Sequence, residues 1–271
     1  MTVPRLRVFA GPNGSGKSTM KSAVPSHLIG IYINPDEIEK AAKEGGRLEF
    51  SDFQLEVEGD EVLGFIKAHR LIRSTQLVEE ASNIDFSNNG LNFQSVAMNS
   101  YFASVLSDFM RHKLLEAQLS FTFETVMSSE DKVAFMLKAK ASGYRTYLYF
   151  VATEDPDINI NRVKNRVAAG GHPVPTEKIV QRYGRCLNLL PAAIAASNRA
   201  YIFDNSGADL VLLAEVTDGT DLEFRADEIP DWFMQAYVEK VSRICCRVDR
   251  NLGSAPFHLI PRILSIRSAT R

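Results

Sequence analysis

The chain has 271 residues, and its 31 Lys and Arg against 33 Asp and Glu leave a formal net charge of −2 at pH 7. This balance excludes a globally basic protein, so nucleic acid is not expected as a partner. No apolar run approaches the roughly 18 residues of a membrane span. The three cysteines, Cys186, Cys245 and Cys246, form no disulfide framework, and the N-terminal residues lack a signal-peptide pattern. We therefore expect a cytoplasmic protein without membrane contact.

The most informative segment is 11–18, which reads GPNGSGKS, a complete G-x-x-x-x-G-K-[ST] phosphate-binding loop. A predicted strand at 6–10 precedes it and a predicted helix begins at Lys17, which is the context that the motif requires. Its glycines allow positive φ and close backbone approach, so successive N–H groups can converge on one anion. The loop predicts a nucleoside triphosphate as ligand, ATP or GTP, together with Mg²⁺.

Each position of the loop is a predicted cofactor-binding residue. Lys17 would reach the β- and γ-phosphates, and the Ser18 hydroxyl would be the metal ligand. The complete set is Gly11, Pro12, Asn13, Gly14, Ser15, Gly16, Lys17, Ser18 and Thr19.

A second apolar run, 29–33, predicts a strand that ends in Asn34-Pro35-Asp36. Pro35 restrains the exit from the strand and places Asp36 just past its C-terminal end. In open parallel sheets that end is where ligands bind. Asp36 can act there as a base on an acceptor hydroxyl, or it can cap a helix that starts at Glu37, and the residues alone favour neither.

The next part of the chain is charged and broken by glycines, and its structure is not predicted up to about Glu80. Residues 81–93 are rich in Asn and Ser and predict a loop, whereas 94–119 carry apolar residues at helical spacing. A short buried strand, 121–123, then leads to Glu124 and Thr125. Glu124 can bind substrate or metal, or cap a helix.

The strongest predicted strand is 146–152, and a helix that begins at Ser128 or Ser129 and ends near Gly143 precedes it. After it, Asp155-Pro156 reads as an N-cap followed by proline at the first helical position.

Arginines gather on two predicted helices, 155–169 and 176–190, which a rigid Gly-Gly-His-Pro turn joins. Arg162 and Arg166 lie at i and i+4 and share a face, and Arg182 lies on the second helix. Because the planar guanidinium pairs with phosphate oxygens bidentately, these helices predict a lid that clamps phosphates. The alternative is a solvated basic face.

Near the end of this region, a strand at 201–203 is followed by Asp204, where Asn205 and Ser206 favour an Asx turn over a functional role. Residues 211–226 predict an antiparallel hairpin at the sheet edge.

The alternation of strands and helices predicts an α/β fold of the P-loop NTPase type, a three-layer sandwich with a parallel central sheet and helices on both faces. We expect a kinase domain over 1–215, with a helical insertion at about 38–119 and the lid at about 155–190. Residues 216–271 would form a C-terminal extension of hairpin and helix with a basic tail.

Together these segments resemble the zeta toxin family of P-loop kinases. The collinear matches between about Arg5 and Leu213 are GPNGSGKST, INPDEI, SFTFETVMSS, RVKNRVAAGGHPVP, IVQRYGR and YIFDNS. The resemblance implies an adenylate-kinase-like fold and the use of ATP and Mg²⁺ to phosphorylate the 3′-hydroxyl of UDP-N-acetylglucosamine. It also implies a protein antitoxin as partner.

The resemblance further implies roles for individual residues. Asp36 would be the catalytic base, and Lys17, Arg162 and Arg166 would be the other catalytic residues. The position of the family's second phosphate-contacting arginine falls near His172 here. The substrate-binding residues would be Asp36, Glu124, Thr125, Arg166 and Arg182.

Two other functions stay open at this point. A polynucleotide or nucleoside kinase shares the loop, the aspartate and an arginine lid. A regulatory P-loop ATPase would bind nucleotide and a protein partner without transferring phosphate to a small molecule.

Overall fold

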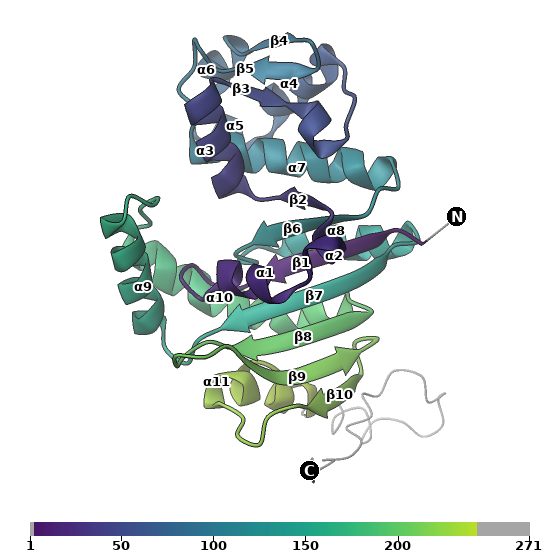
Figure 1. Cartoon of the computed structure of the whole chain (residues 1–271), viewed down its shortest axis with the longest axis vertical. Helices are drawn as coiled ribbons and strands as arrows, with labels where there is room; N and C mark the ends of the chain where they lie inside the picture. Colours follow the sequence, from purple (N-terminus) through teal and green to yellow (C-terminus); the bar gives the residue numbers. More distant parts are fainter. Residues whose placement is uncertain (1–2, 243–271) are drawn as a thin grey trace. The chain divides into compact units, whose positions relative to one another are not determined.

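The computed structural model describes residues 3–242, which divide into two compact units (Figure 1). Unit 2 is Ile29–Glu124, and unit 1 consists of the chain before Ile29 together with the chain from Thr125 onward. The predicted basic tail lies outside the described residues, as do Cys245 and Cys246. Within residues 3–242, no helix has both the length and the apolar character needed to cross a membrane.

Unit 1 contains a twisted sheet in which the strands run β10-β9-β8-β7-β1 (Figure 1). β1, β7 and β8 are parallel, whereas β9 and β10 form an antiparallel hairpin at the edge. This confirms the predicted α/β class with a mostly parallel sheet and the predicted edge hairpin. The bounds are β1 Arg5–Ala10, β7 Arg145–Ala152, β8 Arg199–Asp204, β9 Val211–Thr217 and β10 Asp221–Phe224.

Helices cover both faces of this sheet. In Figure 1, α1 lies in front of β1 and β7, and α8 and α10 lie behind the sheet. Asp155 caps α9 as predicted, since its Oδ1 accepts from Asp157 N at 2.8 Å, and Pro156 is the first residue of that helix. The bounds are α1 Lys17–Ala23, α2 Ser26–Ile29, α8 Glu130–Ala141, α9 Pro156–Ala168, α10 Thr176–Ala195, α11 Asp231–Phe233 and η2 Met234–Val238.

Unit 2 is built around α7, whose apolar side chains are buried at the predicted helical spacing. The helix begins at Ser100, after the cap Asn99, and therefore later than the apolar pattern that starts at residue 94. β2 and β6 pair in parallel. The bounds are β2 Ile31–Ile33, α3 Pro35–Gly45, β3 Arg47–Glu49, η1 Phe50–Phe53, α4 Gly59–Ala68, α5 Arg70–Ser74, α6 Val78–Ser82, β4 Asp85–Ser87, β5 Gly90–Asn92, α7 Ser100–Glu116 and β6 Phe121–Thr125.

The prediction of a loop over 81–93 is wrong, because β4 and β5 form an antiparallel hairpin there. Asn88 and Asn89 are its two turn residues, with φ of 46° and 56°. Asparagine enters the left-handed region more easily than most residues, and two such residues give the turn that matches the twist of a hairpin. The Asn-Asn-Gly sequence therefore favours the turn of this hairpin. The two strands have only a weak alternation of apolar residues, so the sequence does not predict them.

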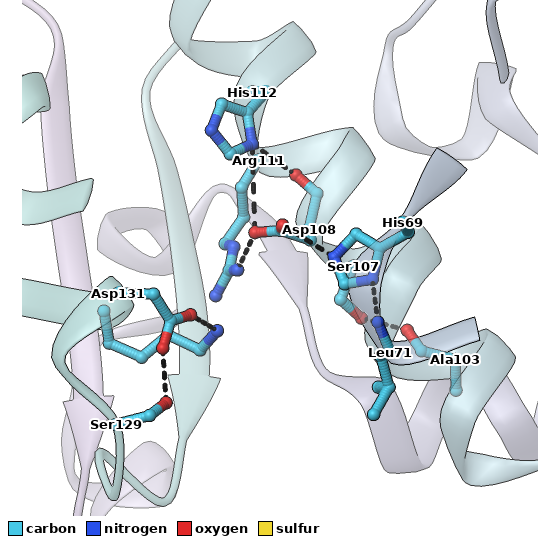
Figure 2. A network of polar contacts seen from close by, with 10 residues as sticks. His69, Leu71, Ala103, Ser107, Asp108, Arg111, His112, Ser129 and Asp131 are labelled. Atoms are coloured by element: carbon cyan, nitrogen blue, oxygen red, sulfur yellow. Dashed lines mark hydrogen bonds and ion pairs between the residues drawn. The ribbon is translucent and has the colours of Figure 1, made fainter. Parts of the chain in front are cut away.

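A polar network in unit 2 fastens the start of α5 to α7 (Figure 2). His69 Nδ1 accepts a hydrogen bond from Leu71 N at 3.1 Å, and His69 Nε2 lies 3.4 Å from Asp108 Oδ2. The neutral ring therefore carries its proton on Nε2 and donates it to Asp108. Arg111 also donates to Asp108 from the following turn of α7. The network has a structural role in holding the two helices together.

Candidate functional site

The predicted phosphate-binding loop connects β1 to α1 in unit 1. Gly14 and Gly16 have φ of 77° and 98°, in the region that favours glycine. A Cβ atom on Gly11 would lie 2.0 Å from Val151 O, and one on Gly16 would lie 2.0 Å from Asn205 Nδ2. The glycines are therefore required for close approach of the surrounding chain as well as for the backbone conformation.

Lys17 is held against the loop that precedes it. Its Nζ donates to Gly11 O at 2.9 Å and to Pro12 O at 3.0 Å, and the residue is 8% exposed. The ammonium group thus lies at the backbone of the loop, where phosphate oxygens would meet it. The next two residues, Ser18 and Thr19, lie exposed in the first turn of α1.

Two asparagines outside the motif bind the loop's carbonyl groups. Asn159 Nδ2 on α9 donates to Asn13 O at 2.6 Å, and Asn205 Nδ2, which follows β8, donates to Ser15 O at 2.8 Å. Asn159 is fully buried and Asn205 is 8% exposed. Neither residue is predicted from the sequence as part of the site. Their one sequence signal is their position after the C-terminal end of a predicted strand.

Two of the predicted arginines reach the surroundings of the loop. Arg182 Nη1 donates to Asn13 Oδ1 at 3.4 Å. Arg162 donates to Asn205 O at 2.7 Å and to Gly207 O at 3.2 Å, so it binds the turn after β8. Arg182 therefore contacts the loop itself, and Arg162 contacts Asn205, which binds the loop.

Arg166 lies one turn beyond Arg162 on α9 and is exposed. Its Nη2 donates to His172 O at 2.8 Å, within the predicted Gly-Gly-His-Pro turn. The structure therefore places Arg166 at the junction between α9 and α10.

Asp204 has a structural role, as the sequence predicts. Its Oδ2 accepts from Ser206 N at 2.9 Å, which makes the predicted Asx turn, and its Oδ1 accepts from Trp232 Nε1 at 2.8 Å. These bonds fix the chain where Asn205 leaves β8.

In unit 2, Asp36 is the second residue of α3, directly after β2. The cap of this helix is Asn34, whose Oδ1 accepts from Asp36 N at 2.9 Å, and Pro35 is the first helical residue. The alternative that Asp36 is the cap is therefore excluded. Asp36 is exposed, and its carboxylate makes no hydrogen bond or ion pair within residues 3–242.

Glu124 at the end of β6 binds two side chains from the β2 segment. Its Oε2 accepts from Tyr32 OH at 2.7 Å and from Asn34 Nδ2 at 3.3 Å. Burial raises the pKa of Tyr32, and the nearby charge of Glu124 raises it further, so the phenol stays a donor. Glu124 is thus linked through Asn34 to the backbone of Asp36.

The neighbouring Thr125 takes part in a local turn, where its Oγ1 accepts from Met127 N at 3.1 Å.

Among residues 3–242 no group of three or more His, Cys, Asp or Glu side chains could hold a metal ion. Unit 1 thus carries the loop with Arg162 and Arg182, and unit 2 carries Asp36 with Glu124.

Residues 92–212 match the model of a family described as zeta toxin. An uncharacterized protein from Haemophilus influenzae is 28% identical over 72 residues, which cover 27% of this chain and 51% of that protein. The match therefore spans about half the length of this curated relative.

Crystal structures of the complex AvrRxo1-ORF1:AvrRxo1-ORF2 are similar in fold. The native complex has a TM-score of 0.54 and 13% identity, covering 93% of this chain and 72% of that chain. The complex with ATP has a TM-score of 0.51 and 13% identity, covering 94% and 66%. At these identities the likeness concerns the fold alone.

Proposed function

We propose that the chain is a P-loop kinase, and the match of residues 92–212 to the zeta toxin family model supports this proposal. It transfers the γ-phosphoryl group of ATP to a hydroxyl of a sugar nucleotide such as UDP-N-acetylglucosamine. The observation that carries the proposal is the glycine loop between β1 and α1, with Lys17 buried against the Gly11 and Pro12 carbonyls. The fold shared with a protein whose structure is described with ATP supports that nucleotide over GTP.

We assign binding of the phosphate donor to unit 1. Lys17 neutralises the β- and γ-phosphates, and Arg162, Arg166 and Arg182 supply further positive charge from the lid. The residues fit a triphosphate, because the loop conformation at Gly14 and Gly16 is one that a Cβ atom would prevent. Mg²⁺ would bind the triphosphate and the exposed Ser18 hydroxyl, where it offsets phosphate charge.

We assign recognition of the acceptor to unit 2. The Asp36 carboxylate accepts the proton of the acceptor hydroxyl while that oxygen forms its bond to the γ-phosphorus and ADP departs. An exposed carboxylate that has no partner among the described residues is suited to this role. Glu124 and Thr125 bind other hydroxyl groups of the acceptor, and Glu124 has one carboxylate oxygen, Oε2, already engaged by Tyr32 and Asn34.

A protein antitoxin and a cytoplasmic location belong to the same proposal. The proteins with a similar fold are described as complexes of two named components, AvrRxo1-ORF1 and AvrRxo1-ORF2. We infer that this chain also acts in a pair, with a partner that limits its kinase activity.

The proposal is tested by incubating purified protein with [γ-³²P]ATP and Mg²⁺ and separate pools of sugar nucleotides, nucleosides and 5′-hydroxyl oligonucleotides. We expect label on a sugar nucleotide, and no labelled product from Lys17→Ala. Label on nucleosides or oligonucleotides would instead support a nucleoside or polynucleotide kinase. Release of free phosphate with no labelled acceptor would support a regulatory ATPase and contradict the proposal.

A further inference from the structure

We propose that Asn159 and Asn205 are positioning residues that orient the backbone of the phosphate-binding loop. They hold two carbonyl groups away from the ligand and thereby turn the N–H groups of Gly14 and Gly16 toward the phosphates. The inference rests on the proposed function, because it takes the triphosphate of ATP as the ligand of the loop.

The geometry of the peptide group fixes the direction of each N–H group in the loop. In a trans peptide, the C=O of one residue and the N–H of the next point in opposite directions. Asn159 Nδ2 holds Asn13 O at 2.6 Å, so the Gly14 N–H points away from Asn159. Asn205 Nδ2 holds Ser15 O at 2.8 Å, and the Gly16 N–H points away from Asn205 in the same manner.

The two N–H groups are available for a ligand. Within residues 3–242 no hydrogen bond uses the N–H of Gly14 or of Gly16. A carbonyl oxygen repels a phosphate oxygen, whereas an N–H group binds it, so the orientation of each peptide decides whether the loop attracts the anion. Without a donor on its carbonyl, each of these peptides can rotate its oxygen toward the phosphates.

The two glycines leave room for the asparagines. A Cβ atom on Gly14 would lie 2.5 Å from Asn159 O, and one on Gly16 would lie 2.0 Å from Asn205 Nδ2. The motif glycines therefore allow the chain segments that carry the two amides to approach the loop. This explains why the loop and the two asparagines form one packed unit.

Both asparagines are themselves held in place. Thr153 Oγ1 donates to Asn159 Oδ1, which fixes the orientation of that amide with Nδ2 toward the loop. The backbone of Asn205 is held from two sides, since its N–H donates to Ala152 O at 2.9 Å and its carbonyl accepts from Arg162 at 2.7 Å. Arg162 thus also supports the loop through Asn205.

The test measures binding of ATP and of inorganic tripolyphosphate, in Mg²⁺, by titration calorimetry of the full chain. Asn205→Ala and Asn159→Ala each remove one donor, and we expect each to raise the Kd of both ligands by about tenfold. Asn205→Asp keeps the size of the side chain but directs a carboxylate at Ser15 O, and we expect a larger increase.

The matched control is Asn198→Ala, because Asn198 directly precedes β8 and Asn205 directly follows it. Asn198 is also hydrogen-bonded, with its Nδ2 3.1 Å from Asp218 Oδ1 and its Oδ1 3.0 Å from Thr146 N. We expect loss of stability without a change in either Kd. Should Asn159→Ala fail to fold, the less buried Asn205 variants decide the question.

The outcomes separate this inference from the proposed function. A wild-type protein that binds neither ATP nor tripolyphosphate would contradict the proposed function. Wild-type binding that is unchanged in folded Asn205→Ala and Asn205→Asp would overturn the inference alone.

Discussion

At the scale of single residues, the side chain of Asn34 connects Asp36 and Glu124 of unit 2. Its Oδ1 caps α3 at Asp36 N, and its Nδ2 donates to Glu124 Oε2 at 3.3 Å and lies 3.4 Å from Tyr32 OH. The amide can make these contacts in one orientation, because oxygen must face the backbone N–H and nitrogen must face the carboxylate. Asn34 therefore sets where α3 begins and where Asp36 lies.

Replacing Asn34 with alanine should lower the free energy of unfolding by about 1 kcal/mol, the usual effect of losing a cap. It should also lower kcat while leaving the Kd for ATP unchanged, because Asp36 loses its defined position. The control is Asn99→Ala, which removes the cap of α7, where Asn99 Oδ1 accepts from Tyr101 N at 3.0 Å. Equal loss of kcat in both variants at matched stability would show that Asn34 acts through stability alone.

The two asparagines that bind the loop have partners that are distant in the sequence. Asn159 and Asn205 bind loop residues that are 146 and 190 positions away in the chain. A motif is contiguous and can be recognised directly, whereas these contacts depend on how β7, α9 and β8 fold together. The cap of α3 is a local feature, but Asn and Asp are both favourable N-cap residues. Only the structure shows that Asn34, and not Asp36, is the cap.

At the scale of elements, local signals predict most of unit 1. Asp155-Pro156 marks the start of α9, and Asp218-Gly219, with φ of 49° and 76°, marks the β9–β10 turn. These residues favour a turn or a helix start through their local backbone preferences, so the sequence predicts both elements without knowledge of distant contacts. In unit 2 the β4–β5 hairpin was missed because its strands have three residues each.

Helix α10 contains Gly184, which gives a direct test of helix propensity. The residue is exposed, and a Cβ atom there would meet nothing within 4 Å. Gly184→Ala should therefore raise the free energy of unfolding, measured in urea, by about 0.5–1 kcal/mol. Gly219→Ala should destabilise, because φ is 76° and a Cβ would lie 2.9 Å from Ala195 Cα. Destabilisation by Gly184→Ala would contradict the structure of α10.

At the scale of the whole molecule, composition and the order of strands and helices predict the α/β class. The insertion expected at about 38–119 lies within unit 2, but neither signal predicts the boundaries of that unit at Ile29 and Glu124. The division depends on the density of contacts between residues. The sequence between Ile38 and Glu80 is charged and broken by glycines, so it does not predict that density.

Buried tyrosines predict the response of the protein to alkaline pH. Burial raises the pKa of Tyr144, Tyr183 and Tyr237 to about 12, above the ordinary value of 10.0. The folded state therefore holds these protons more tightly than the unfolded state does. Their contribution to stability is complete below pH 10 and is lost as the pH rises toward 12.

Urea unfolding at pH values between 9 and 12 should show this decrease in the free energy of unfolding. Tyr237→Phe should make the decrease smaller, because it removes one of the phenols whose pKa burial raises. The matched control is Tyr101→Phe, which removes the phenol of a tyrosine that is 39% exposed. A profile that is flat over this range would contradict the burial of these side chains.

We propose that the loop of unit 1 binds the phosphate donor and that Asp36 of unit 2 activates the acceptor. The most direct measurement compares phosphoryl transfer and ATP affinity in Asp36→Asn, with the neighbouring Glu37→Gln as control. We predict that Asp36→Asn abolishes transfer of label from [γ-³²P]ATP to the acceptor and leaves the Kd for ATP unchanged, and that Glu37→Gln retains both. Transfer at the wild-type rate in Asp36→Asn would contradict the proposed role of Asp36.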